Sequence, residues 1–472
     1  MGTYKTPGIY IVEKSAFPNS IVEVATAIPA FVGFTEKAED GLHSLLKTPF
    51  KISTMSEFEQ HFGGAPTPVF SMKKNTENPQ LNLNGEKYSF SSANNSYSLH
   101  RNMLMFFANG GGPCYIMSIG DYNTAITKEG FIAGIDKLKE EQEPTMLVIP
   151  EAATTDFCMD LQQHMLDHCA AMQNRVAILD VPENTSSNIT TITNNFRDKV
   201  GNNLSYGAAY YPFLQSSTLT ERDITYLNLD TECLNICIGS LSVTPPQKDA
   251  TEQEKTSFHN LLIQNSSSYK AVVTTIRTML NLVPPSAAIA GIYTMVDNSR
   301  GVWKAPANVM VNQVVSLSRT LTNAEQEDLN VTISGKSINA IRYFTGEGIK
   351  VWGARSLDGN SLEWRYVNVR RTMIYLEQSI KNAARAYVFE PNVAATWLNM
   401  KSMIENFLRG VWKRGGLAGA SPEEAFEVHV GLGDTMSPED ILEGYLRMTI
   451  LVAISHPAEF IEITFQQQMQ KS

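Results

Sequence analysis

The stretch "MLMFFANGGGPCYIMSI", residues 103–119, indicates the order of helix and strand in the first half of the chain. The apolar residues before the glycines recur at helical spacing, whereas residues 115–119 form an apolar run typical of a strand. A phosphate-binding loop has the opposite order, strand then glycines then helix, because the phosphate binds free N–H groups at a helix N-terminus. The order here predicts that the glycines at 110–112 end a helix and turn the chain into a strand.

The same alternation continues on both sides of this turn, from about residue 28 to residue 214. Short apolar runs such as "AFVGF", "TMLVIP" and "VAILDVP" alternate with helical stretches, including residues 156–173. Buried parallel strands flanked by helices have this pattern, so it predicts an α/β layered domain. Two polar stretches, residues 71–98 and 215–270, interrupt the pattern and are expected to be surface insertions that carry loops.

The last hundred residues predict a smaller α+β unit. A strand at "WRYVNV" and a helix at 371–388 are expected first. The helix at 394–414 should then bury the residues spaced at i, i+3, i+4, i+7, i+8 and i+11. These are Met400, Met403, Ile404, Phe407, Leu408 and Val411. Strands are expected at "FEVHVGL", "LRMTILVAI" and "FIEITFQQQ".

Both ends of the chain read as extended segments. "GIYIVE" and "SIVEVA" near the N-terminus, and "FIEITFQQQ" near the C-terminus, have no hairpin partner in adjacent sequence. An isolated strand is unstable in water, so these segments are expected to pair elsewhere, including on another subunit.

Composition narrows the function classes. The chain has 472 residues, 43% of them hydrophobic and 18% charged, which fits two or three globular domains. Its net charge of −10 argues against a nucleic-acid binder. Neither a signal-peptide core nor a run long enough to cross a membrane is apparent, so synthesis in the cytoplasm is expected. The five scattered cysteines predict reduced, buried thiols.

Motifs for catalysis or metal binding are weak. His164 and His168 would share a helix face, as in zinc sites, but Met165 stands where the zincin pattern needs Glu. The alternative is an ordinary helix face with satisfied histidines. Cys233 and Cys237 are spaced too widely for a Cys-x-x-Cys pair and are read as buried apolar residues.

Four further residues offer chemistry but also have structural explanations. Ser421 and Ser437 each precede proline and acidic residues, a pattern typical of helix N-caps. Asp180 and Asp297 are expected at strand ends, where α/β enzymes bind ligands, but neither has a His or Lys nearby in sequence.

Several long segments in order resemble the contractile tail sheath family of myophage tails, contractile bacteriocins and extracellular contractile injection systems. They are "PPSAAIAGIYTMVDNSRGVWKAPAN", "LNVTISGKSINAIRYFTGEGIKVWGARSL", "YVNVRRTMIYLEQSI" and "FEPNVAATWLNMKSMIENFLRGVWKRGGLAGASPEEAFEVHVG". "PGIYIVE" and "FFANGGGPCYIMS" also look like sheath elements. The absence of a very large outer insertion favours an injection system over a phage tail.

The resemblance implies a fold and a division of the chain. The expected parts are a subtilisin-like α/β middle domain at 26–355 and a smaller, tube-proximal α+β domain at 356–458. Extended arms flank them at 1–25 and 459–472. The subtilisin catalytic triad does not carry over, because no motif matches it, and no cofactor or metal is implied.

The resemblance also implies a role and partners. Sheath subunits stack as rings around an inner tube and contract to drive it through a target envelope. The partners would be further copies of the chain in a helical polymer, sheath paralogues, the inner tube, and baseplate and tail terminator proteins, without nucleic acid or membrane insertion. Assembly would occur in the cytoplasm, within a phage tail-like particle that can be released.

The residues assigned to these roles lie in the arms and on one helix. The arms that would join subunits by adding strands to a neighbour's sheet contain Gly8, Ile9, Tyr10, Ile11, Val12, Glu13, Phe460, Ile461, Glu462, Ile463, Thr464 and Phe465. A basic stripe made of Lys401, Arg409, Lys413 and Arg414 would face the tube. An ordinary solvated helix face explains the stripe equally well.

The alternative function class is an enzyme. An α/β hydrolase-like enzyme would use Asp180, His164 or His168 at strand or helix ends, where open α/β sheets place ligands. The length and order of the matching segments favour the non-enzymatic sheath.

Overall fold

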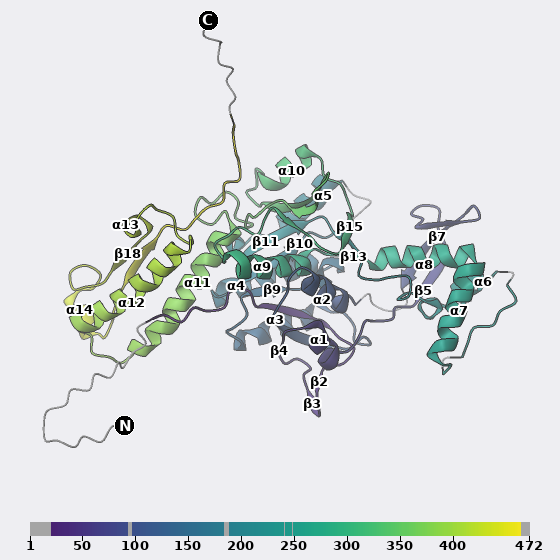
Figure 1. The fold of residues 1–472 in the computed structure, drawn as a ribbon, viewed down its shortest axis with the longest axis horizontal. Helices are drawn as coiled ribbons and strands as arrows, with labels where there is room; N and C mark the ends of the chain where they lie inside the picture. Colours follow the sequence, from purple (N-terminus) through teal and green to yellow (C-terminus); the bar gives the residue numbers. More distant parts are fainter. Residues whose placement is uncertain (1–19, 93–96, 184–187, 240, 248, 464–472) are drawn as a thin grey trace, which may run out of the picture. The chain divides into compact units, whose positions relative to one another are not determined.

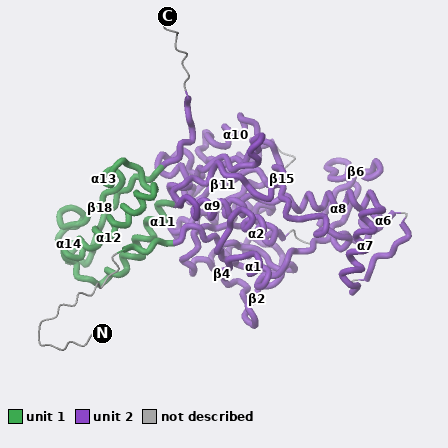
Figure 2. Tube along the Cα trace, in the orientation of Figure 1, with its two compact units in different colours: residues 1–24, 372–455 green, residues 25–371, 456–472 purple. Residues whose placement is uncertain are grey.

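The structure is a computed structural model that describes residues 20–92, 97–183, 188–239, 241–247 and 249–463. The chain divides into two compact units (Figure 2). Unit 1 comprises residues 1–24 and 372–455, and unit 2 comprises residues 25–371 and 456–472. The boundary falls inside helix α11 (Val367–Ala384), whereas the sequence placed it at residue 356.

A mixed sheet forms the centre of unit 2. Within the described residues it has nine strands, in the order β14-β17-β16-β11-β10-β9-β1-β8-β4. Figure 1 labels β4, β9, β10 and β11 of this sheet. The strands from β8 to β16 are parallel, whereas β4 is antiparallel to β8, β17 to β16, and β14 to β17. Their bounds are β1 (Pro29–Phe34), β4 (Phe50–Ile52), β8 (Cys114–Gly120), β9 (Met146–Val148), β10 (Val176–Asp180), β11 (Gly207–Tyr211), β14 (Val309–Met310), β16 (Ile338–Phe344) and β17 (Gly348–Val351). The alternating pattern therefore predicted the α/β class correctly.

Helices cover both faces of this sheet. On one face, α3 (Lys128–Lys137), α4 (Cys158–Met172) and α5 (Ile189–Lys199) share a core with alternate residues of the central strands. On the other face, Phe106 of α2 (Leu99–Ala108) packs edge-on against Phe31 of β1, with ring centroids 5.1 Å apart. There Tyr293 of α9 (Ser286–Arg300) meets Tyr210 of β11. Coverage on both sides explains why these strands are continuous apolar runs.

The glycine stretch is a helix-to-strand turn, as predicted. Helix α2 ends at Ala108, Gly110 has φ of +94°, and the Gly111 N–H donates to the Phe106 carbonyl, which closes the helix end. A Cβ at Gly110 would lie 2.7 Å from Cβ of Met295 on α9. The glycine therefore serves both the backbone conformation and the packing of α2 on α9.

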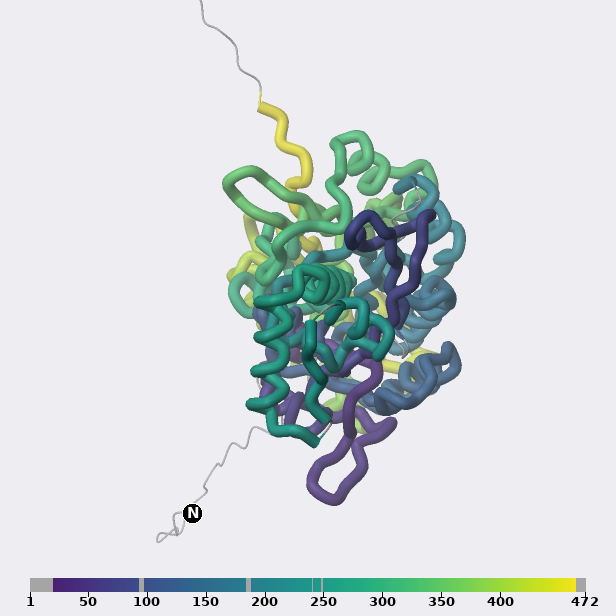
Figure 3. Tube along the Cα trace, turned by 90° about the vertical axis from the view of Figure 1, so that its right-hand side faces the viewer, coloured from purple at the N-terminus to yellow at the C-terminus, as the bar shows by residue number. Residues whose placement is uncertain are grey.

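The two polar stretches are folded, which corrects the expectation of loops. Strands β5 (Phe70–Lys74), β6 (Leu81–Leu83) and β7 (Glu86–Ser92) form an antiparallel sheet. This sheet shares one core with α6 (Thr231–Ile238), α7 (Glu252–Asn265) and α8 (Ser267–Leu280) (Figure 3). The Asn and Ser content wrongly suggested loops. The polar side chains occupy the outer faces of these strands and helices, whereas apolar side chains line the inner faces.

Smaller elements complete unit 2. They are β2 (Glu39–Asp40), β3 (His43–Ser44), α1 (Met55–Phe62), β12 (Leu214–Ser216), β13 (Leu282–Val283), β15 (Val314–Leu317) and α10 (Asn323–Asn330). β13, β12 and β15 form a three-stranded antiparallel sheet in that order.

Unit 1 has the expected α+β character, with two corrections. Its elements are the greater part of α11, α12 (Ala394–Lys413), α13 (Pro422–Ala425), β18 (Phe426–His429), α14 (Pro438–Leu442) and β19 (Thr449–Val452). The strand expected at "WRYVNV" is wrong, since α11 already begins at Val367. Residues 20–25 form no strand either, and Ile21 is instead buried in a segment whose Val24 N–H donates to Ser379 Oγ.

Helix α12 matches its prediction residue by residue. Its buried side chains are Met400, Met403, Ile404, Phe407, Leu408 and Val411. The chain leaves the helix through Gly415, at φ of +84°, and the Gly416 N–H donates to the Val411 carbonyl. The regular apolar spacing was sufficient here because one face of the helix is buried and the other is not.

Candidate assembly site

The small sheet of unit 1 is the first feature suited to joining subunits. Phe426 of β18 pairs with Val452 of β19, and His429 pairs with Thr449, in antiparallel register. In the described residues this sheet contains only these two strands, so each keeps an edge without a strand partner. A two-stranded ribbon is marginally stable alone, and open edges can pair with another chain.

The described part of the C-terminal arm is extended and exposed. Phe460, Ile461 and Ile463 are 75%, 79% and 69% exposed, and Glu462 is also exposed. The expected strand is not formed at residues 460–463, which have no sheet partner in this single subunit. Thr464 and Phe465, and all of Gly8, Ile9, Tyr10, Ile11, Val12 and Glu13, lie outside the described residues.

Two of the four cations in the basic stripe on α12, Lys401 and Arg414, lie close to a glutamate. Arg409 and Lys413 are exposed, and Lys401 Nζ lies 3.7 Å from Glu405 Oε1 one turn away. Arg414 is exposed as expected, and both of its Nη atoms donate to the Glu23 carboxylate, at 3.0 and 2.6 Å. Its charge is therefore already compensated within unit 1.

The place where α/β enzymes bind ligands is filled by the chain itself. The strand order reverses between β1 and β9, and ligands of open α/β sheets bind at the carboxyl ends of such strands. Glu151, which follows β9, accepts hydrogen bonds there from the N–H groups of Phe34, Ser98 and Leu99, at 2.7 to 3.0 Å. Burial raises the pKa of Glu151 to about 7, although the N–H donors and Arg101 oppose this. A carboxylate of the chain thus occupies the N-terminus of α2.

Asp180 has a similar structural role. It ends β10, and its Oδ1 accepts the Ser286 N–H at the start of α9, at 2.8 Å. Burial raises the pKa of Asp180 to about 7, against the opposing effect of the Ser286 hydrogen bonds. Asp297 lies inside α9, not at the strand end expected from the sequence, and it is held by a buried ion pair with Arg371.

The histidines and cysteines are not brought together into a metal site. His164 Nε2 lies 3.4 Å from Asp136, whereas His168 is buried and contacts Arg175. Burial and the nearby Arg175 lower the pKa of His168 to about 4, so its ring is neutral at pH 7. All five cysteines are buried free thiols, as predicted. Among the described residues, no cluster of three metal-ligating side chains occurs.

Ser421 and Ser437 precede short helices, as the sequence predicted. Ser437 Oγ accepts the Asp440 N–H while Asp440 accepts the Ser437 N–H, which is a reciprocal capping box. Ser421 has extended backbone angles before Pro422 at the start of α13. Both serines therefore occupy the N-cap position of a short helix.

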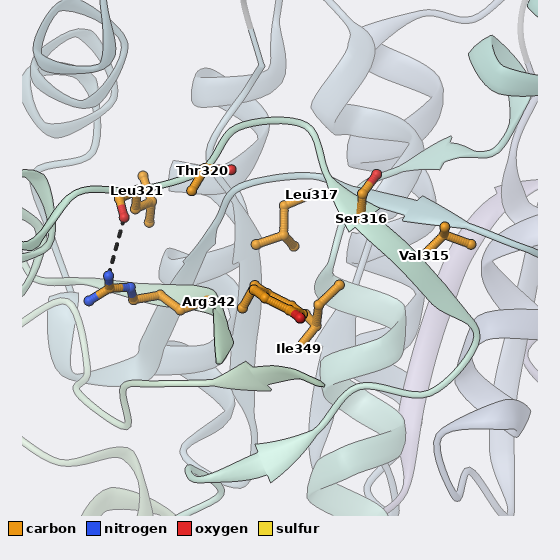
Figure 4. A pocket seen from close by; sticks show the side chains of 8 residues that line it. Val315, Ser316, Leu317, Thr320, Leu321, Arg342 and Ile349 are labelled. Carbon is orange, nitrogen blue, oxygen red and sulfur yellow. Dashed lines mark hydrogen bonds between the residues drawn. The ribbon is translucent and has the colours of Figure 1, made fainter. Parts of the chain in front are cut away.

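An open pocket of about 190 Å³ lies between β15, β16 and β17 (Figure 4). Leu317, Leu321 and Ile349 supply its apolar wall. Its cation, Arg342, donates to the Leu321 carbonyl, Asn323 Oδ1 and Gln326 Oε1. Because these internal acceptors engage the guanidinium, the pocket does not present a free charge to a ligand.

Alanine at His164, His168 or Asp180, taken one at a time, is expected to leave subunit assembly unchanged. Asp180→Ala should cost about 1–3 kcal/mol of unfolding free energy, because the buried Ser286 N–H loses its acceptor. His164→Ala should cost less, under about 1 kcal/mol, because the His164 side chain is 32% exposed and its contact with Asp136 is partly solvated. Urea unfolding and particle yield measure both effects. Loss of assembly in a variant of normal stability would support a chemical role for that residue.

The sequence did not identify the residues that hold the terminal segments. Arg355 and Glu459 are paired, as are Glu23 and Arg414, although each pair is widely separated along the chain. Local spacing carries no signal for such pairs.

Among the described residues, no helix is both long and apolar enough to cross a bilayer.

These contacts define a class of protein. It is an α/β layered subunit whose strand-end carboxylates cap its own helices, and whose open features are a terminal segment and the edges of a small sheet. Residues 124–357 match the family described as "Phage tail sheath protein central domain", and residues 360–468 match "Phage tail sheath C-terminal domain". The chain therefore belongs to the contractile tail sheath family.

Individual relatives agree with this assignment. The chain is 25% identical to the sheath of an extracellular contractile injection system, PVC, in the contracted state, with a TM-score of 0.64 over 99% of both chains. It is 27% identical to the contracted helical sheath of the anti-feeding prophage, AFP, with a TM-score of 0.64 over 99% of this chain and all of that one. A tail sheath protein of Vibrio phage KVP40 is 23% identical over 39% of this chain. The match spans only 26% of that phage protein.

Proposed function

We propose that the chain is a structural subunit that polymerises as stacked rings around an inner tube and contracts to drive that tube through a target envelope. The observation that carries the proposal is the likeness over nearly the whole chain to two contracted sheaths, at 25% and 27% identity. The middle domain is proposed to be subtilisin-like in fold without subtilisin's chemistry. In this account the energy of contraction is stored in the extended lattice, so no nucleotide is consumed.

The arms are proposed to join subunits by strand addition. Residues 7–13 and 459–466 would pair with the open edges of β18 and β19 in neighbouring copies, and each backbone ladder would add hydrogen bonds without requiring a rigid interface. Such a head-to-tail contact does not close on itself, so it builds a helical tube. The further partners are the tube, baseplate and terminator proteins, and sheath paralogues. Assembly is proposed to occur in the cytoplasm, with the particle acting after release.

Negative-stain microscopy of the purified chain, expressed with and without its tube protein, tests the proposal. Hollow cylinders of uniform width are expected. Small particles of uniform size at the same protein concentration would contradict it.

The stripe on α12 gives a second test, of tube contact. We propose that Lys401, Arg409 and Lys413 face the tube through many weak, screened contacts that break together. The triple variant Lys401→Glu, Arg409→Glu, Lys413→Glu should then yield contracted or empty sheaths, counted in micrographs.

The matched control reverses three exposed lysines of β5 and β7: Lys73, Lys74 and Lys87. It changes the net charge equally and should leave tube-filled particles at normal yield. Normal, tube-filled particles from the α12 variant would show that the stripe only faces solvent.

A further inference from the structure

The two terminal segments leave the folded units in a similar way. Each is held by one glutamate, and each glutamate is bound by one arginine and one tyrosine that are distant in sequence. On the C-terminal side these are Glu459, Arg355 and Tyr366, all in unit 2. On the N-terminal side they are Glu23, Arg414 and Tyr375, all in unit 1.

The C-terminal cluster is dense and shielded. Arg355 donates to Glu459 through Nε at 3.0 Å and Nη2 at 2.7 Å, Tyr366 OH donates at 2.8 Å, and Asn330 Nδ2 donates at 2.7 Å. The side chains of Arg355 and Glu459 are 5% and 19% exposed. Burial alone would raise the pKa of Glu459, but these donors outweigh it and the pKa is lowered. The carboxylate therefore stays charged at neutral pH, and the cluster weakens only as the pH falls below the ordinary carboxyl range.

The N-terminal cluster has the same chemistry but is open to water. Arg414 and Glu23 are 46% and 43% exposed. Tyr375 also hydrogen-bonds to the cluster, and with Arg414 it lowers the pKa of Glu23 against the opposing effect of burial. Exposed ion pairs are weak and screened by salt, whereas shielded, multiply hydrogen-bonded ones are screened much less.

We propose that these clusters are anchors of unequal strength that set the free length of each arm: Glu459 fixes the C-terminal arm permanently, and Glu23 holds the N-terminal arm releasably. Besides Glu23, the described holds before the Thr26 carbonyl, which accepts from Arg371 and Thr145, are the hydrogen bond from the Val24 N–H to Ser379 Oγ and the burial of Ile21. Release of Glu23 together with these two holds would free residues 20–24 and add up to about 17 Å of reach at ~3.3 Å per residue. The use of this extra chain length in a lattice rests on the proposed sheath function. The two clusters themselves lie within the single subunit and do not depend on that function.

Hydrogen–deuterium exchange on the isolated subunit tests the anchors directly. Raising NaCl from 0.05 to 1 M should speed exchange in residues 20–25 at least threefold and leave residues 456–463 unchanged. Glu459→Gln should speed exchange in 456–463 at least tenfold, and Glu23→Gln should make 20–25 fast at both salt concentrations. Glu77→Gln, the same charge change at an exposed glutamate between β5 and β6, should alter neither segment.

Wild-type exchange in Glu459→Gln, or an equal salt response of both segments, would overturn the inference whether or not the chain forms sheaths. If Glu459→Gln unfolds, Glu459→Asp, which shortens the side chain, takes its place with the same expectation. In assembled particles, Glu23→Gln should widen the spread of ring spacings in the extended state, whereas Glu77→Gln should not. A failure to form sheaths in the wild type would contradict the proposed function alone.

Discussion

Deletion of residues 1–13 is expected to abolish polymerisation while leaving the subunit folded. The deleted residues precede the described chain, and the described residues from Ile21 onward supply a buried core of their own. In the proposed assembly these residues supply ladder hydrogen bonds to the open edge of a neighbour's sheet, and no other contact replaces them. Light scattering should show monomers, and thermal unfolding should be close to that of the full chain. Deletion of residues 459–472 should have the same effect on assembly, with the added loss of the Glu459 cluster.

Point variants make this test sharper. Ile461→Pro removes one N–H and cannot join a ladder, so it should reduce sheath yield strongly. Ile461→Val keeps the N–H and a β-branched side chain, so it should assemble normally. Sheaths of normal length and yield from either deletion, or from the proline variant, would show that the arms do not connect subunits.

Arg371→Met is expected to lower the free energy of unfolding by about 3–5 kcal/mol. Arg371 donates to both carboxylate oxygens of Asp297, at 2.9 and 2.6 Å, and the two side chains are 3% and 1% exposed. Its guanidinium also lies 4.6 Å from the ring centre of Tyr293. Removing the arginine leaves a buried carboxylate without a counter-charge, which costs far more than the loss of a surface pair.

Urea unfolding measures this loss, with two comparisons. The double variant Arg371→Met, Asp297→Asn should recover part of the stability because it removes the isolated charge. Lys401→Met, which breaks the exposed pair with Glu405, should cost at most about 0.5 kcal/mol. A loss below about 1 kcal/mol in Arg371→Met would show that Asp297 is solvated or re-paired without the arginine.

Features governed by local periodicity could be predicted from the sequence. The apolar spacing in 394–414 identified each buried residue of α12, and the glycines at 110–112 correctly indicated the end of α2. Continuous apolar runs also indicated parallel strands, because both faces of the sheet are buried.

Features that depend on long-range packing could not be predicted from the sequence. The β-branched residues at "YVNV" favoured a strand, but burial of α11 from Val367 onward overrides this weak local preference. The folded polar stretches share a core only because segments distant in sequence meet. The anchors of Glu23 and Glu459 are likewise pairs that become neighbours only in the folded chain.

The most direct test of the central claim is helical reconstruction by cryo-electron microscopy of particles before and after contraction. The same subunit fold is expected in two lattices, with a shorter axial spacing after contraction and with both arms paired to neighbouring sheets in each. A single lattice under every condition, or a contracted lattice in which the arms pair with nothing, would contradict it.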